Sequence, residues 1–217
     1  MKLKFNLLIS NTERSLFYVR ELKKNNLYPE HIIYLDNEKN KNYLTEIKKY
    51  FSKNIKIYKS KKLSKKVCNF LLNLKEDFII YSSYPGDIVK NEQLLDKKKL
   101  LHSHSGKLPE FKGSTTIYYS ILMLNKIFCS TIIMNKKIDE GKILYVNEYS
   151  MPKNMFSIDK NFDSKIRAQN MIYVLKNFNK LKKITTKSKR NFHYYVIHPF
   201  LRSIVFGNYE NNIRKKK

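Results

Sequence analysis

The sequence predicts an α/β fold: a Rossmann-like, mostly parallel sheet with flanking helices. Short apolar runs that suit buried strands alternate with longer amphipathic stretches, as expected for consecutive βαβ units. The 217 residues are 42% hydrophobic and 13% aromatic, enough to bury a sizeable core despite a net charge of +26. We expect one main domain over residues 1–150 and a smaller appendage over residues 151–217.

Five apolar runs in the first half of the chain predict the strands of the parallel sheet. They cover residues 4–10, 31–36, 54–58, 77–83 and 98–104. Helices are predicted between them, over 12–25, 40–51 and 60–74, where apolar residues recur at helical spacing. Ser10 and Glu13 have the spacing of a capping box at the start of the first helix.

The second half is expected to complete the sheet and then form the appendage. A helix is predicted over 113–125, followed by two strands over 127–135 and 142–150 that suit a mixed sheet edge. Residues 157–183 predict one long helix. Residues 191–206 alternate and are broken at His198-Pro199, which predicts a terminal strand pair, and the final IRKKK suits a solvated tail.

The strong positive charge favours anionic partners. A positive field attracts phosphorylated substrates, polyglutamates, nucleic acid or a membrane surface. Only six of the 44 basic residues are Arg, however, and the heavy use of Lys, Asn and Ile is typical of an A/T-rich coding sequence. No RRM, KH or helix-turn-helix pattern is present, which disfavours nucleic acid as a partner.

The cysteines and the N-terminus bear on zinc binding and on the cellular location of the protein. Cys68 and Cys129 lie in apolar contexts without the spacing of a zinc site, so we expect two reduced core residues. The N-terminal apolar run is too short for a signal peptide, and no window approaches a membrane span. We therefore expect a cytoplasmic protein with no membrane span.

Four of the five glycines fall in one window of the chain, at Gly86, Gly106, Gly113 and Gly141. In a chain this poor in glycine, each one indicates a backbone position with positive φ or close approach to a ligand. Three loops of this window follow predicted strands, and ligands of open α/β sheets bind at the carboxyl ends of strands. The sequence therefore predicts one pocket where these loops meet.

His102 and His104 are the most distinctive pair in this window. Separated by one residue, they point to the same face of a strand. Two imidazoles with no third ligand at a suitable spacing make a poor metal site, so we expect no metal. The structural alternative is a pair of hydrogen-bonded core histidines, and Asp139 before Glu140-Gly141 is equally a good turn residue.

Taken together, the window resembles the formyltransferases that use 10-formyltetrahydrofolate. The family includes glycinamide ribonucleotide, methionyl-tRNA and amino-sugar formyltransferases. Residues 102–113, HSHSGKLPEFKG, are similar to the family stretch Asn-x-His-x-x-x-Leu-Pro-x-(Phe/Tyr)-x-Gly. A helix, the strand at Cys129-Ser130-Thr131 and the turn at Ile138-Asp139-Glu140-Gly141 follow in the family's order, so residues 81–146 carry the resemblance.

The resemblance implies a catalytic set of His102, His104 and Asp139. The family's His and Asp fall on His104 and Asp139, while His102 occupies its Asn position, where an imidazole N–H can also donate to a developing oxyanion. An unprotonated amine would attack the formyl carbon, with His104 stabilising the oxyanion and assisting proton transfer. Asp139 would orient His104 or a water and take the amine proton, which a pKa raised by burial would favour.

The resemblance also implies the site of the co-substrate, 10-formyltetrahydrofolate. The loop after the fourth strand and the loop that carries Asp139 would offer backbone groups to the pterin ring, and nearby lysines would suit the glutamate tail. The expected folate-binding residues are Tyr84, Pro85, Gly86, Asp87, Ile88, Lys137, Ile138 and Gly141. Without the resemblance, Tyr84-Pro85-Gly86 is an ordinary turn.

The acceptor implied is a primary amine on a nucleotide-linked amino sugar used in surface-polysaccharide biosynthesis. The first loop lacks the Gly-rich turn of the purine-pathway enzyme, and too few residues follow position 150 for the C-terminal barrel of the methionyl-tRNA enzyme. The tail, with Ile166-Arg167-Ala168 on a helix, resembles that of sugar formyltransferases. The expected acceptor-binding residues are Asn11, Arg14, Lys107 and Lys112.

A second hypothesis is a catalytically altered or inactive protein on the same fold. It would bind an anionic ligand, either a glycan precursor or RNA, and His102 would mark the loss of catalysis. Stabilisation by a folate analogue separates the two hypotheses, because an enzyme of this family binds folate. The sequence leaves the oligomeric state open, a homodimer included.

Overall fold

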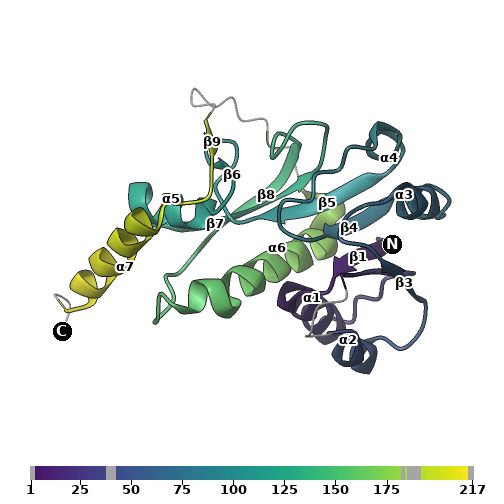
Figure 1. The fold of residues 1–217 in the computed structure, drawn as a ribbon, viewed down its shortest axis with the longest axis horizontal. Coiled ribbons are helices and arrows are strands. Elements are labelled where there is room, and N and C mark those ends of the chain that lie inside the picture. Colours follow the sequence, from purple (N-terminus) through teal and green to yellow (C-terminus); the bar gives the residue numbers. More distant parts are fainter. Residues whose placement is uncertain (1–2, 38–42, 182–183, 185–191, 215–217) are drawn as a thin grey trace.

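A seven-stranded mixed sheet forms the centre of the molecule (Figure 1). The computed structural model describes residues 3–37, 43–181, 184 and 192–214. The strand order is β3-β2-β1-β4-β5-β7-β8. The strands are β1 (Phe5–Ser10), β2 (Ile32–Asp36), β3 (Ile55–Lys59), β4 (Phe78–Ser82), β5 (Lys99–His104), β7 (Ile127–Ile133) and β8 (Lys142–Tyr149). β1 to β5 pair in parallel and β7 and β8 are antiparallel, which confirms the predicted Rossmann-like sheet and its mixed edge.

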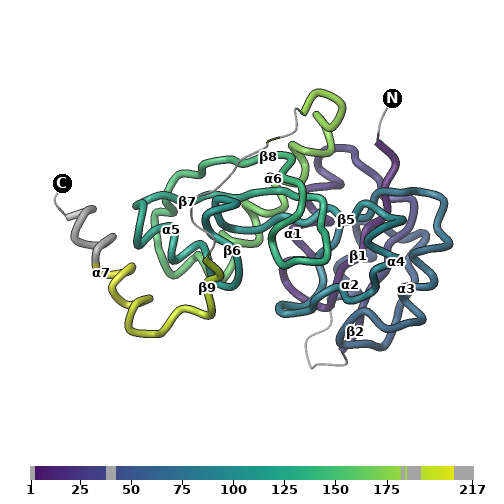
Figure 2. Tube along the Cα trace, turned by 90° about the horizontal axis from the view of Figure 1, so that it is seen from above, coloured from purple at the N-terminus to yellow at the C-terminus, as the bar shows by residue number. Residues whose placement is uncertain are grey.

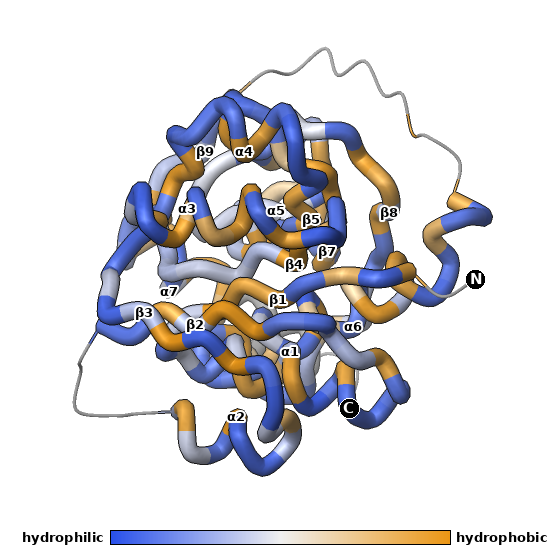
Figure 3. Tube along the Cα trace, turned by 90° about the vertical axis from the view of Figure 1, so that its right-hand side faces the viewer, coloured by the Kyte–Doolittle hydropathy of each residue, from blue (hydrophilic) through white to orange (hydrophobic). Residues whose placement is uncertain are grey.

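Helices cover both faces of this sheet, so the molecule has three layers (Figure 3). One face packs against α1 (Glu13–Lys24), α2 (Leu44–Tyr50) and α6 (Asp163–Asn177), and the other against α3 (Lys65–Leu72) and α4 (Glu92–Lys97). Along β1, Leu7 and Ile9 enter the first core while Leu8 enters the second. Continuous apolar runs thus predicted these strands correctly, because a central parallel strand is buried on both faces.

Helix α6 belongs to the main core. A π-helical turn (Ile158–Phe162) leads into it and a short 3-10 turn (Phe178–Lys180) follows it. Its residues Ala168, Met171 and Val174 are buried in the same cluster as Phe5 of β1. The predicted boundary at residue 150 therefore does not separate this helix from the sheet. Residues 182–183 of the predicted long helix lie outside the described residues.

The start of α1 differs from the prediction. Ser10 is the last residue of β1, and Thr12 is the N-cap residue of the helix, with no side-chain cap bond. The Ser15 hydroxyl instead donates to the Ser10 carbonyl at 2.5 Å. The predicted capping box is wrong because the strand continues to Ser10. Helix α4 was not predicted, and Asn91 caps it by accepting from the Leu94 N–H at 2.8 Å.

The predicted strand pair over 191–206 is also wrong; residue 191 itself lies outside the described residues. Only β9 (His193–Tyr194) is a strand, parallel to β6 (Lys112–Gly113), and α7 (Pro199–Arg214) follows it. Proline suits the first turn of a helix because its φ is preset and it needs no N–H partner. Val205 of α7 is buried in a cluster with Ile117 and Ile121 of α5 (Thr116–Leu124).

The C-terminal helix α7 extends away from the end of the sheet that carries β1 to β3 (Figure 2). Residues 215–217 of the predicted basic tail lie outside the described residues. Cys68 and Cys129 are both free and buried, as expected. Within the described parts of the chain, no helix combines the length and the apolar character needed to cross a bilayer.

Candidate active site

A cavity of about 540 Å³ opens where the predicted loops meet. Its walls are the loop after β4, the end of β5, the start of α5, the loop after β7 and the segment around β9. The volume lies within the range of small-molecule sites, and the location is the strand-end position expected for an open α/β sheet. His102, His104 and Asp139 all line it, as the sequence predicted.

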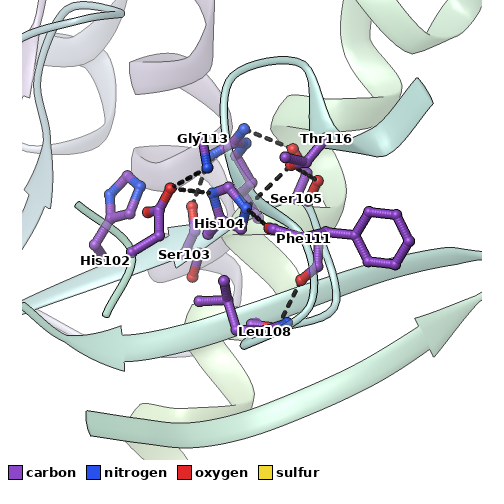
Figure 4. Close-up of polar contacts among 12 residues, drawn as sticks. His102, Ser103, His104, Ser105, Leu108, Phe111, Gly113 and Thr116 are labelled. Carbon is purple, nitrogen blue, oxygen red and sulfur yellow. Dashed lines mark hydrogen bonds and ion pairs between the residues drawn. The ribbon is translucent and has the colours of Figure 1, made fainter. Parts of the chain in front are cut away.

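His104 is fixed by hydrogen bonds to its Nε2 (Figure 4). This nitrogen lies 2.7 Å from the Phe111 carbonyl and 3.0 Å from the Thr116 hydroxyl, which itself donates to the Ser105 carbonyl. Because a carbonyl only accepts, Nε2 must carry the proton. Nδ1 is therefore the nitrogen left for chemistry, and it lies 3.4 Å from Oδ2 of Asp139.

Asp139 faces His104 from the turn between β7 and β8. Its φ of 54° is left-handed, so it is both the turn residue and the partner of His104. Its Oδ2 also accepts from the Gly113 N–H at 2.9 Å. Burial alone would raise the pKa of Asp139, but His104 and His102 outweigh burial and lower it. The expected raised pKa is wrong, and the carboxylate is ionised at neutral pH.

The pair of His104 and Asp139 is thus ready to accept a proton. Burial lowers the pKa of His104 and outweighs the opposing effect of Asp139, so the imidazole is neutral at pH 7. The separation of 3.4 Å is longer than a charge-assisted hydrogen bond of about 2.7–2.9 Å, consistent with no proton between the two atoms. A proton delivered to the pair would lie between Nδ1 and Oδ2.

His102 differs from the expectation of an oxyanion donor. Its Nδ1 lies 3.1 Å from the Tyr81 carbonyl, so Nδ1 carries the proton and donates it to the backbone. Burial, with a further contribution from Arg167, lowers the pKa of His102 to about 4. The imidazole is therefore neutral at pH 7, and its remaining nitrogen, Nε2, is an acceptor.

Two glycines permit this arrangement. A Cβ at Gly106 would lie 2.8 Å from the His104 Nε2 and 2.9 Å from the Phe111 carbonyl oxygen. Gly113 has a φ of 105°, and a Cβ there would lie 2.1 Å from the Tyr194 carbonyl oxygen. Gly113 therefore lets β9 approach β6 while its N–H holds Asp139.

A partly buried ion pair at the wall of the pocket was not predicted as part of the site. Arg167 of α6 contacts Asp163 at 2.9 Å and donates to the Ser103 carbonyl and the Ser105 hydroxyl, at 2.7 and 2.6 Å. These contacts fix the backbone on both sides of His104, at the end of β5. The sequence did carry one signal for this pair. Arginine is rare in the chain, and two of its six arginines, Arg167 and Arg14, line the pocket.

Most of the predicted folate-binding residues line the pocket. They are Tyr84, Pro85, Gly86, Asp87, Ile88, Lys137 and Ile138. The Asp87 side chain holds its own loop, accepting from the hydroxyls of Ser83 and Tyr81 at 2.5 and 3.0 Å. Ile88 and Ile138 are exposed by 48% and 45%, which gives the pocket an apolar rim. Gly141 is not among the lining residues.

Of the four predicted acceptor-binding residues, only Arg14 lines the pocket, and it donates to the Ser83 carbonyl at 2.6 Å. Asn11 accepts from the Tyr43 N–H at 3.0 Å. Lys112 is buried and pairs with Glu140 at 2.7 Å, and Lys107 pairs with Glu110 at 3.7 Å. The structure does not bring these three residues into the pocket.

The segment around β9 contributes pocket residues that the sequence did not suggest. His193, Tyr194, Tyr195 and Val196 line the opening. Thr115, a β-branched residue with a φ of 51°, tethers the segment by accepting from the Ile197 N–H at 2.8 Å. A β-branched residue rarely adopts this conformation, so the tether holds strained backbone at the edge of the site.

Known proteins are similar to this chain in sequence or in fold. A methionyl-tRNA formyltransferase of Helicobacter pylori is 34% identical over 92 residues, which are 42% of this chain and 30% of that protein. A sugar N-formyltransferase structure from a Shewanella species matches 94% of this chain and 86% of its own, with a TM-score of 0.61 and 18% identity. The chain has the fold of the formyltransferases. The predicted resemblance to the family is confirmed.

A further structure with the formyltransferase fold is an N-formyltransferase of Helicobacter canadensis in complex with folinic acid and dTDP-3-aminofucose. It matches 89% of this chain and 71% of its own, with a TM-score of 0.59 and 18% identity. The sequence match to the curated relative spans less than a third of that relative's length. No protein-family model matches the chain.

Proposed function

We propose that the protein is an N-formyltransferase that moves a formyl group from 10-formyltetrahydrofolate to a primary amine, on a nucleotide-linked amino sugar used in polysaccharide biosynthesis. The observation that carries this proposal is the proton-free Nδ1 of His104 facing the Asp139 carboxylate in a pocket of suitable size. Acyl transfer to an amine releases a proton, and a preset acceptor for it is what such a site needs.

The folate would supply the formyl carbon, which bonds to the acceptor nitrogen as tetrahydrofolate leaves. Asp139 and His104 take the proton that the attacking amine loses and hold it between Oδ2 and Nδ1. The pair then returns the proton to the departing nitrogen, so that protons balance over the cycle. Once protonated at Nδ1, His104 is a cation that stabilises negative charge on the formyl oxygen.

The residues of the pocket fit a folate. The apolar side chains of Ile88 and Ile138 lie on the rim, where they suit the faces of a flat pterin ring. Lys136 and Lys137 lie beside them and suit the anionic glutamate tail. The structure of the Helicobacter canadensis protein, with folinic acid bound on a similar fold, supports this assignment.

An amino sugar is the acceptor that the similar structures favour. The sugar N-formyltransferase structure from a Shewanella species matches this chain in fold over 94% of its residues, and the Helicobacter canadensis structure on a similar fold holds dTDP-3-aminofucose. The methionyl-tRNA formyltransferase similarity is one of sequence, over 42% of the chain. The latter supports a second candidate acceptor, the amine of methionyl-tRNA. Arg14 in the pocket suits an anionic group of either acceptor.

Folinic acid is expected to bind in this pocket, and titration calorimetry measures it. Ile138→Arg should weaken binding by at least about tenfold, because a charge replaces apolar contact with the ring. Ile57→Arg is the matched control, since Ile57 on β3 is exposed by 43%, close to the 45% of Ile138, and lies outside the pocket. It should leave the affinity unchanged.

Two outcomes would oppose the proposal. A folded protein that gives no heat with folinic acid would favour the catalytically altered binding protein. Equal affinity in the parent and the Ile138→Arg variant would place the folate elsewhere. Circular dichroism of each variant verifies that the fold is intact before titration.

A further inference from the structure

Three groups with metal-ligating atoms meet in the pocket. One ring nitrogen of His102, one of His104 and a carboxylate oxygen of Asp139 all lie within 4.8 Å of one another. His102 and His104 leave the end of β5 toward the same side, as Figure 4 shows. The third ligand, which the spacing of the two histidines did not provide, comes from the turn after β7.

Both histidines are preset as ligands. His102 donates from Nδ1 to the Tyr81 carbonyl at 3.1 Å, and His104 donates from Nε2 to the Phe111 carbonyl at 2.7 Å. The nitrogens left without a proton are Nε2 of His102 and Nδ1 of His104. Metal-bound histidines in proteins characteristically donate their other N–H to a backbone carbonyl or carboxylate, which fixes the tautomer and orients the ring.

The spacing also suits a small divalent cation. Zinc bonds of about 2.0–2.1 Å give a tetrahedron with edges of roughly 3.3 Å, and the distance from His104 Nδ1 to Asp139 Oδ2 is 3.4 Å. One ring nitrogen of His102 completes the group, in which all three ligand atoms lie within 4.8 Å of one another. Arg167 and Arg14 nearby oppose a cation, although Asp163 offsets the charge of Arg167.

We propose that His102, His104 and Asp139 form a three-ligand site for a divalent transition metal of the zinc type, with its open position facing the pocket. Two imidazoles and one carboxylate are a donor set that zinc accepts. The proposal does not depend on formyl transfer. An ion at this site and a transferred proton would compete for the same two atoms, Nδ1 of His104 and Oδ2 of Asp139.

Titration of the chelator-stripped protein with Co²⁺ and Zn²⁺ tests the site. The parent should bind one equivalent, seen as heat and as visible Co²⁺ absorption bands that Zn²⁺ abolishes. His102→Asn should weaken binding by at least about 100-fold, beyond the loss typical of an outer-shell partner. His198→Asn is the control, since His198 is exposed and outside the cluster, and it should bind as the parent does.

Absence of any Co²⁺ band and of heat in the folded parent would overturn the proposal. Equal affinity in the parent and the His102→Asn variant would overturn it as well. If His102→Asn does not fold, Asp139→Asn serves as the second ligand variant, with the same expected loss. His102→Asn keeps His104 and Asp139, so folinic acid titration of this variant tests the proposed function separately.

Discussion

Replacing His104 by alanine is expected to lower the rate of formyl transfer by about 10²- to 10⁴-fold, the usual contribution of a positioned acid–base group. The variant loses Nδ1, the nitrogen that faces Asp139 across 3.4 Å. Folinic acid affinity should change little, because the folate-binding loops remain in place. The measurement is kcat with saturating 10-formyltetrahydrofolate and the amine acceptor.

Asp139→Asn should lower kcat to a similar extent while keeping the shape of the side chain, whose oxygen can still accept from the Gly113 N–H. Because His104 and Asp139 hold the same proton, the double variant should be little slower than either single one. Asp96→Asn is the matched control, an exposed aspartate that does not line the pocket. An Asp139→Asn variant with more than half of the parental kcat would contradict this role.

Replacing Arg167 by methionine is expected to lower the free energy of unfolding by about 2–3 kcal/mol. Breaking one partner of a fully buried ion pair costs about 3–5 kcal/mol, and the side chains of Arg167 and Asp163 are 15% and 26% exposed, so the smaller figure applies. The midpoint of thermal unfolding should fall by about 5–10 °C for a chain of this size. The Arg167→Met/Asp163→Leu double variant should lose less unfolding free energy than the two single variants together, because no charge is left unpaired.

The exposed pair of Lys126 and Glu148 is the matched control, with the same 2.9 Å separation but side chains exposed by 51% and 50%. Lys126→Met should cost less than about 1 kcal/mol. Equal losses of unfolding free energy in Arg167→Met and Lys126→Met would contradict the importance of burial. A loss in the double variant equal to the sum of the two single losses would contradict the pairing.

The contribution of Asp163 should also depend on pH. Burial alone would raise the pKa of Asp163, but the Arg167 guanidinium outweighs it and holds the pKa below its ordinary value. A carboxyl with a lowered folded-state pKa adds stability above its unfolded pKa, near 3.9, and loses it as the pH falls. The stability difference between the parent and Asp163→Asn should therefore be constant above about pH 5 and shrink in more acidic solution.

The sheet was largely predictable from the sequence because its strands are continuous apolar runs. β1, β2 and β4 are buried on both faces, so no alternation was needed to find them. The short elements were missed: β6 has only two residues, and its partner β9 pairs across a long stretch of sequence. At α7 the pattern was ambiguous, and Pro199 began a helix where a break between two strands was expected.

The part of the site that a continuous motif carries was predictable. The properties that depend on tertiary contacts, such as tautomers and pKa values, were not. The resemblance over 81–146 placed His104 and Asp139 in one pocket, where the structure also has them. The tautomers of His102 and His104 depend on the carbonyls of Tyr81 and Phe111, which only the fold brings near. The lowered pKa of Asp139 has the same origin, because the groups that lower it, His104 and His102 on β5 and the Gly113 N–H, reach it only through the fold.

The most direct test is a formyl-transfer assay with 10-formyltetrahydrofolate and a dTDP-linked 3-amino sugar, with mass spectrometry of the acceptor. We expect a formylated sugar nucleotide from the parent, and at least about 10²-fold less from Asp139→Asn. The same assay with methionyl-tRNA in place of the sugar nucleotide tests the second candidate acceptor. A folded parent that binds folinic acid but formylates neither acceptor would contradict the assignment of His104 and Asp139 to formyl transfer.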